Sequence, residues 1–120
     1  MNFVFYRPRN DPSVISVDKN DNMKTIINND NCRGRVDALD GDTALGKLEY
    51  EIEGGRMRIL HTYTFKGHEG KGVGKALVEA AVAEARRQQV AVEPVCSFAQ
   101  AYFERHHDLR QLLAGHTEYF

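Results

Sequence analysis

Alternating apolar and charged positions predict two antiparallel strands in the middle of the chain. Leu48, Tyr50 and Ile52 alternate with charged residues, which is the period of a strand that buries one face. Two glycines follow at 54–55, and a glycine pair between such runs favours a tight hairpin. The odd-numbered side chains of the return strand are expected to share one face: Met57, Ile59, His61, Tyr63 and Phe65.

The part of the chain before these strands has weaker signals. A strand is predicted from Arg33 to Leu39. Short apolar runs at 14–17 and 25–27 fit brief strands in a segment rich in Asn and Asp, residues that favour turns. We predict a domain over residues 23–120, with residues 1–22 as a possible N-terminal extension. The alternative, in which residues 1–22 add an edge strand or hairpin, stays open.

A spacing of three and four residues after a glycine-rich loop predicts an amphipathic helix. Its apolar positions are Val73, Leu77, Val78, Ala80, Ala81, Val82 and Ala85. Glu84 is expected on the polar side, and Arg86 and Arg87 suit the C-terminal end of the helix dipole. A short apolar strand over 90–95 follows. A strand, a helix and a strand in this order predict a right-handed crossover with parallel pairing.

A second helix is predicted over 98–106, because Ala99, Tyr102 and Phe103 fall on one face. Leucines at 109, 112 and 113 indicate a further helical turn. From Arg33 onward the order of elements is β-β-β-α-β-α. We therefore expect an α+β fold, with a mixed β-sheet flanked by helices.

Charge and composition narrow the range of partners. The 120 residues suit one domain, and 16 Lys and Arg against 17 Asp and Glu leave a net charge of -1. We therefore expect no nucleic-acid partner. Apolar runs are too short for a membrane-spanning helix, so no membrane partner is expected. Cys32 and Cys96 lack metal or CxxC spacing and are predicted to be free thiols in a reducing cytoplasm.

The glycine-rich loop is the strongest candidate for a binding site. Glycines without side chains let an anion approach the main chain, and the following helix begins with partial positive charge. Two lysines add cationic groups. The residues expected to hold a phosphate or pyrophosphate are Gly70, Lys71, Gly72, Val73, Gly74 and Lys75. The alternative is a tight turn with solvated lysines.

Two common nucleotide motifs fail at this loop. A Walker loop needs Ser or Thr after Gly74-Lys75, and the chain has Ala76 there, with Glu69 in place of the first glycine. The dinucleotide fingerprint GxGxxG lacks its third glycine in either frame. We also expect no metal, because no carboxylate–histidine cluster is visible and the adjacent His106 and His107 point apart on a helix.

The loop resembles that of the GNAT superfamily of acetyltransferases, whose pyrophosphate-binding loop has the form Gln/Arg-x-x-Gly-x-Gly/Ala. Gly72-Val73-Gly74 matches the glycine half, while Glu69 departs from the Gln/Arg position. Residues 61–62, 94–98 and 101–106 add to a resemblance to the small, single-domain GNAT-like subfamily, over roughly 33–110. The resemblance implies a GNAT-like fold with a shortened acceptor-binding region.

The resemblance also implies a site for acetyl-CoA. Thr62, Tyr63 and Thr64 would contact the pantetheine arm, which a splay between their strand and 90–95 would admit. Tyr102 would protonate the leaving sulfur; the alternative is ordinary core packing. Cys96 follows the last core strand at a helix N-terminus, which favours negative charge, and in the subfamily lies near the acetyl group. It would act as a nucleophile, or be a small buried residue.

The function implied by the resemblance is acetyl-CoA-dependent N-acetyl transfer to an unidentified amine. The alternative is an acetyl-CoA-binding module or sensor without efficient transfer, since the acceptor region is trimmed. His61 is expected to be a satisfied core histidine, with a general base as the second interpretation. The acceptor and the oligomeric state remain open at this stage.

Overall fold

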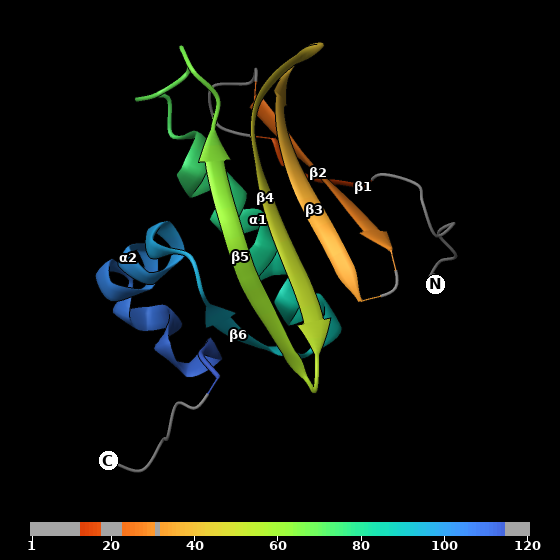
Figure 1. The fold of residues 1–120 in the computed structure, drawn as a ribbon, viewed down its shortest axis with the longest axis vertical. Coiled ribbons are helices and arrows are strands. Elements are labelled where there is room, and N and C mark those ends of the chain that lie inside the picture. The colour runs from red at the N-terminus through yellow and green to blue at the C-terminus, as the bar shows by residue number, and fades with distance from the viewer. Residues whose placement is uncertain (1–12, 18–22, 31, 115–120) are drawn as a thin grey trace.

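A single six-stranded sheet, with its strands in sequence order, is the frame of the protein (Figure 1). The computed structural model describes residues 13–17, 23–30 and 32–114. The elements are β1 (Ser13–Val17), β2 (Met23–Asp30), β3 (Arg33–Asp40), β4 (Thr43–Glu53), β5 (Arg56–Thr64), α1 (Val73–Gln88), β6 (Ala91–Pro94), α2 (Ser97–Arg105) and the 3₁₀ helix η1 (His107–Leu112). The predicted α+β class and the order of elements from Arg33 onward are confirmed.

Strand directions make the sheet mixed. β1 to β5 pair antiparallel with their neighbours, and β6 pairs parallel with β5 after the crossover through α1. The hairpin between β4 and β5 turns at Gly54 and Gly55, which have φ angles of 61° and 77°. Two successive positive φ angles match a type I′ turn, the turn that fits the twist of a tight hairpin.

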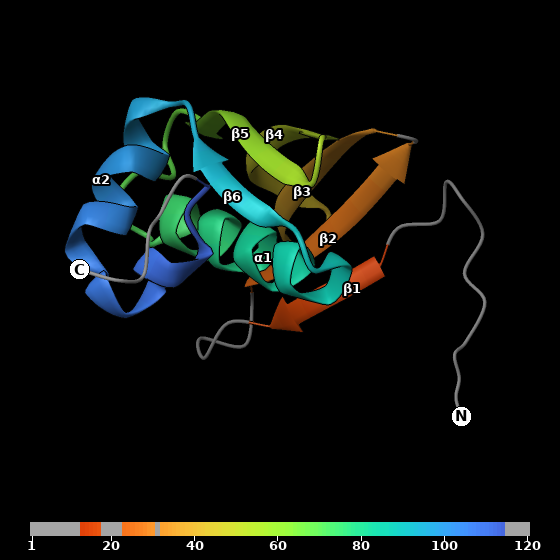
Figure 2. The ribbon, with the colours of Figure 1, turned by 90° about the horizontal axis from the view of Figure 1, so that it is seen from below.

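The core lies between the sheet and α1. The apolar face predicted for α1 is buried, and it packs against buried positions of β2 to β6. Figure 2 shows α1 running across one face of the sheet and α2 beside the β6 edge. No helix of the described residues crosses the opposite face, which we call the open face. Alternation in β4 is confirmed: Leu48 and Tyr50 are buried and Ile52 is partly buried.

The N-terminal edge strand agrees with one of the two expectations for residues 1–22. β1 pairs with β2 through positions such as Ser13↔Ile27 and Val17↔Lys24. Residues 1–12 and 18–22 lie outside the described residues. A domain that begins at residue 23 therefore stays a prediction.

β5 changes face halfway along, contrary to the simple alternation that we expected. Tyr50 pairs with Ile59, but the preceding Glu49 pairs with His61, so Leu60 is an extra residue in β5. A bulge of this kind shifts every later side chain to the other face. Ile59 is fully buried whereas His61 is exposed. Met57 and Ile59 thus do not share a face with the odd-numbered side chains that follow.

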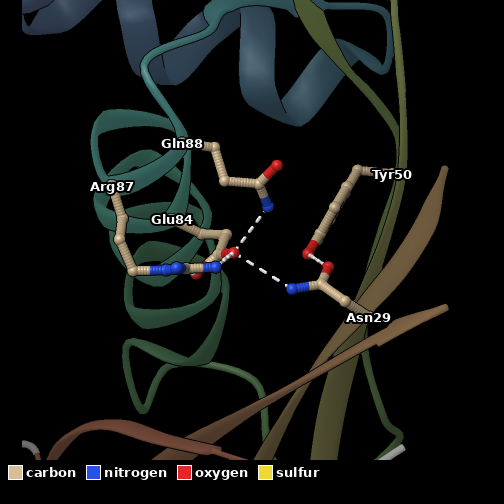
Figure 3. Close-up of polar contacts among 5 residues, drawn as sticks. All are labelled: Asn29, Tyr50, Glu84, Arg87 and Gln88. Carbon is tan, nitrogen blue, oxygen red and sulfur yellow. Dashed lines mark hydrogen bonds and ion pairs between the residues drawn. The ribbon is translucent and has the colours of Figure 1, made fainter. Parts of the chain in front are cut away.

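Glu84 is buried, although its place in the helix pattern predicts the polar side. Its side chain is 1% exposed and accepts hydrogen bonds from Asn29 Nδ2 (3.0 Å), Arg87 Nε (3.0 Å) and Nη2 (2.5 Å), and Gln88 Nε2 (2.6 Å). The Tyr50 hydroxyl donates to Asn29 Oδ1, which extends this polar network to β4 (Figure 3). The donors explain why a carboxylate is tolerated in the interior.

The network sets the charge states of its members. Burial alone would raise the pKa of Glu84, but the hydrogen bonds from Arg87, Gln88 and Asn29 outweigh burial and lower it. Burial and the charge of Glu84 raise the pKa of Tyr50. Glu84 is therefore an anion and Tyr50 a neutral donor at neutral pH. Together they tie α1 to β2 and β4.

The structure also bears on membrane spans, the two cysteines and metal-binding side chains. Within the described part of the chain, no helix combines the length and apolarity needed to cross a bilayer. Cys32 and Cys96 are free thiols, as expected. Among the described residues, no three His, Cys, Asp or Glu side chains gather where they could hold a metal ion.

Candidate functional site

The strands β5 and β6 separate at the end of their short pairing. The last paired residues are Ile59 and Pro94, after which Val95 N and Cys96 N both donate to Ile59 O, at 3.0 and 3.1 Å. From Leu60 to Thr64 the main chain of β5 keeps β4 on one side, and no described strand pairs with the other. Unpaired main-chain groups there are free to bind a ligand as an added strand would.

Two of the predicted site residues meet beside this opening. Thr62 Oγ1 lies 3.3 Å from Cys96 Sγ, a hydrogen bond in which either atom could donate. Cys96 is half-buried and is the N-cap residue of α2. The bulge at Leu60 is the reason that these residues meet, since it turns Thr62 toward the side of the sheet on which α2 packs.

The glycine-rich loop forms a second wall of the site. Gly67, Gly70 and Gly72 have φ angles of 92°, 82° and 79°, in the region that favours glycine. Gly72 is the N-cap of α1, without a side-chain cap and with no acidic residue in the first turn. The first N–H groups of a helix have no partner within it. A side chain at Gly70 or Gly72 would project into open space, so this helix end is accessible to an anion.

The carboxylate of Glu69 points back toward the start of the loop. Its Oε1 accepts a hydrogen bond from Gly67 N at 3.0 Å. Lys71 Nζ donates to His68 Nδ1 at 3.0 Å, and Lys75 is exposed on the first turn of α1. The carboxylate at the position that departs from the family pattern is therefore held within the loop by Gly67.

The first turn of α2 packs directly on the first turn of α1. A Cβ atom at Gly74 would lie 2.5 Å from the ring of Phe98. Four large hydrophobic side chains stay exposed among the described residues: Tyr63, Phe65, Val95 and Phe98. All four belong to the strand ends and helix start that border the opening between β5 and β6.

Tyr102 lies on α2 and lines a cavity that includes neither Thr62 nor Cys96. It is buried, its ring stacks on His106 with centroids 4.0 Å apart, and it lines a cavity of about 350 Å³ with Glu79 and Asp108. Burial and the charges of Glu79 and Asp108 raise the pKa of Tyr102 to about 12. The hydroxyl is therefore protonated at neutral pH. Its catalytic role stays a prediction.

His61 is not the core histidine that we expected. After the bulge it lies exposed on the open face, where its ring stacks with that of Tyr63 at a centroid distance of 5.7 Å. Lys47 Nζ lies 5.6 Å from the centroid of the Tyr63 ring. His61 thus points away from the buried side of the sheet, and its neighbours are aromatic and cationic.

The close approach of two backbones at Gly46 was not predicted from the sequence. A Cβ atom at Gly46 would lie 2.4 Å from Tyr63 O and 2.7 Å from Val73 Cγ1. Gly46 therefore allows β4 to approach both the unpaired end of β5 and the start of α1. A glycine inside an alternating strand is the signal that could have found it, since such a glycine often marks a close approach of two backbones.

The chain is similar to a known protein family and to proteins of known structure. Residues 35–112 match the family model described as GCN5-related N-acetyl-transferase. Among solved structures, a GCN5-like protein from Staphylococcus aureus is 26% identical, with a TM-score of 0.55, and the match covers 78% of this chain and 91% of that one.

A second solved structure, the PaiA N-acetyltransferase from Thermoplasma acidophilum in complex with coenzyme A, has the same fold at 18% identity and a TM-score of 0.51. That match covers 64% of this chain and 50% of the other. No curated protein matches the chain at the required significance. The family model spans the sheet from β3, the glycine-rich loop and both helices, and this chain belongs to the GCN5-related N-acetyltransferase family.

Proposed function

We propose that this protein transfers the acetyl group of acetyl-CoA to an amine. The observation that carries the proposal is the juxtaposition of two features: the unpaired main chain of β5 and the uncapped, glycine-bounded start of α1. The unpaired main chain of β5 suits an extended pantetheine arm, and the start of α1 suits a pyrophosphate. The coenzyme A bound by the Thermoplasma acidophilum protein of the same fold supports this choice of ligand.

The cosubstrate would run along three regions of the site. Main-chain N–H groups of residues 70–75 would bind the pyrophosphate, with Lys71 and Lys75 close by. The arm would follow Thr62, Tyr63 and Thr64 along the free side of β5. The exposed apolar side chains around the opening support this path, because the arm has methyl and methylene groups to bury.

Acetyl transfer moves one proton from the amine nitrogen and one proton to the CoA sulfur. Over the whole reaction, the acetyl carbon exchanges its bond to the CoA sulfur for a bond to the nitrogen of a neutral amine. The nitrogen loses a proton and the CoA sulfur gains one. Unpaired N–H groups of β5 would donate to the carbonyl oxygen as it becomes negative. Tyr102, protonated at neutral pH, stays the candidate proton donor to the sulfur.

Cys96 would accept the acetyl group before the amine does. Its sulfur attacks the thioester carbonyl, CoA leaves as the thiol, and the acetyl group remains on Cys96 until the amine displaces it. The contact with Thr62 at 3.3 Å supports this role, since it orients the Cys96 side chain beside the unpaired part of β5. A cysteine that only fills space would have no acetyl adduct.

Release of free CoA tests the proposal. The protein is incubated with acetyl-CoA and a panel of primary amines, and the CoA released is separated from acetyl-CoA by chromatography and measured. We expect release above spontaneous hydrolysis, and no release from the Gly72→Asp variant. Tight binding of acetyl-CoA without any release above hydrolysis would instead indicate a binding module or sensor, and absence of binding would refute the CoA site.

A further inference from the structure

The end of β6 is held by a side chain of α2. Gln100 Nε2 donates to Pro94 O at 3.4 Å and to Val95 O at 3.2 Å. Successive carbonyls of a regular strand point to opposite edges of that strand. Two successive carbonyls that share one donor are therefore not in strand geometry. The chain leaves the sheet at this point and continues directly into α2 (Figure 1).

The Val95 carbonyl is the group that would continue the pairing of β6 with β5. Val95 N donates to Ile59 O at 3.0 Å. In a regular parallel ladder, the carbonyl of the same residue accepts the next N–H group of the partner that points toward it. Since Val95 O accepts Gln100 instead, the ladder stops at the pair Ile59↔Pro94.

The N–H groups on the free side of β5 follow from its pairing with β4. Phe65 N, directly after β5, donates to Leu45 O of β4 at 2.9 Å. N–H groups alternate in direction along a strand, so those of Thr64 and Thr62 point to the side without a partner strand. The Thr62 N–H group is the first of these after the bulge at Leu60. It is therefore the donor that a continued ladder would give to the Val95 carbonyl.

We propose that Gln100 is a positioning residue that keeps the Thr62 N–H group free for the thioester carbonyl of acetyl-CoA. The inference rests on the proposed acetyl transfer, in which N–H groups of β5 donate to that carbonyl. By holding Val95 O, the amide of Gln100 withdraws the protein acceptor that competes with the thioester. A donor stabilises developing negative charge without reorganisation only when it is not already bonded. Gln100 acts through the Val95 carbonyl rather than on the thioester.

The position of Gln100 makes this role separable from packing. Gln100 N donates to Cys96 O at 3.1 Å, so its main chain is fixed in the first turn of α2. The neighbouring Ala99 is buried, whereas Gln100 is exposed. A substitution of Gln100 therefore removes the two side-chain hydrogen bonds without opening a cavity in the core.

Three variants isolate the donor. Gln100→Met keeps the length of the side chain and its neutral charge but removes the NH₂ group. Gln100→Lys restores a donor that can reach main-chain carbonyls. Gln111→Met is the matched control, because Gln111 is exposed on η1 and its side chain forms no hydrogen bond within the described ranges 23–30 and 32–114. Circular dichroism checks that all three variants are folded.

Hydrogen exchange of the Thr62 amide, measured by NMR without any ligand, is a readout that a purely structural role of Gln100 would not move in this direction. In the wild type we expect fast exchange, because this N–H group has no strand partner. In Gln100→Met we expect exchange about tenfold slower, because the released Val95 carbonyl becomes its acceptor. Gln111→Met and Gln100→Lys should keep the wild-type rate.

Turnover gives the second readout. In Gln100→Met we expect kcat with acetyl-CoA and an amine to fall about tenfold, because Val95 O competes for the donor that the thioester carbonyl needs. The affinity for CoA should not change, since the free thiol has no such carbonyl. Gln100→Lys should restore kcat.

The inference is overturned if the Thr62 amide is already protected in the wild type, or if its exchange is the same in Gln100→Met. A wild-type kcat in Gln100→Met, or equal effects in Gln111→Met, would overturn it as well. The proposed function fails separately, because CoA binding and CoA release are measured on the wild type. If the wild type releases no CoA with any amine, acetyl transfer is wrong, while exchange of Thr62 still decides whether Gln100 holds the Val95 carbonyl away from β5.

Discussion

Replacing Glu84 with glutamine tests whether the buried carboxylate holds α1 on the sheet. The carboxylate is 1% exposed and accepts four hydrogen bonds, two of them from Arg87. Glutamine has the same shape, but its NH₂ group faces donors from Arg87, Gln88 or Asn29. Removing one partner of a buried ion pair costs about 3–5 kcal/mol. The side chain of Arg87 is 52% exposed and can regain water, so we expect a loss of about 2–3 kcal/mol.

The loss should depend on pH in a direction fixed by the carboxylate. The pKa of Glu84 lies below its ordinary value in the folded protein, so the unfolded chain binds more protons than the folded one at acid pH. The stabilisation is therefore fully present above the ordinary carboxyl pKa, and it is lost as the pH falls through the lowered pKa. The difference between wild type and variant should be largest near neutral pH and shrink below about pH 4.

Urea unfolding followed by circular dichroism, at several pH values, measures this difference. Glu104→Gln is the control, because Glu104 is exposed on α2 and its loss should change stability by less than about 0.5 kcal/mol. Equal unfolding free energies for wild type and Glu84→Gln at neutral pH would refute the reasoning. A difference that stays constant down to acid pH would show that charge is not its cause.

Four further substitutions probe the site and its supports. Gly72→Asp should weaken CoA binding at least tenfold by calorimetry, because it places a carboxylate at a φ of 79° beside the expected pyrophosphate. Cys96→Ala should retain CoA affinity but lose any acetyl adduct in intact-mass spectra. Tyr102→Phe should lower kcat by about 10²-fold with unchanged CoA affinity if its hydroxyl donates the proton; unchanged kcat assigns it to packing. Gly34→Ala should destabilise by about 1–3 kcal/mol in urea, since its Cβ would meet the Tyr50 ring at 2.2 Å.

Regular periodicity explains which elements could be predicted. In β4 the alternation of Leu48 and Tyr50 with charged residues coincides with their burial, and in α1 every predicted apolar position is buried. These patterns are readable because a strand or helix facing one core repeats the same environment at a fixed interval. The glycine pair at the hairpin is equally local, since its positive φ angles depend on adjacent residues only.

Glu84 could not be predicted as buried, because its partners are distant in sequence. Asn29 is 55 residues away, on β2, and its amide has to meet the carboxylate across the sheet–helix interface. Composition within the helix indicates only that Arg87 and Gln88 are close. Whether a polar residue of a helix is exposed or satisfied inside therefore depends on tertiary contacts that periodicity does not contain.

The bulge at Leu60 explains why the side chains at the end of β5 do not face the sides that simple alternation predicted. Residues 61–64 have a regular polar and aromatic alternation, and nothing in their composition indicates one extra residue before them. The shift turns Thr62 toward Cys96 and leaves His61 and Tyr63 on the open face. It also coincides with the point at which β6 ends. One strand therefore has a free edge from Leu60 onward and presents different side chains to each face of the sheet.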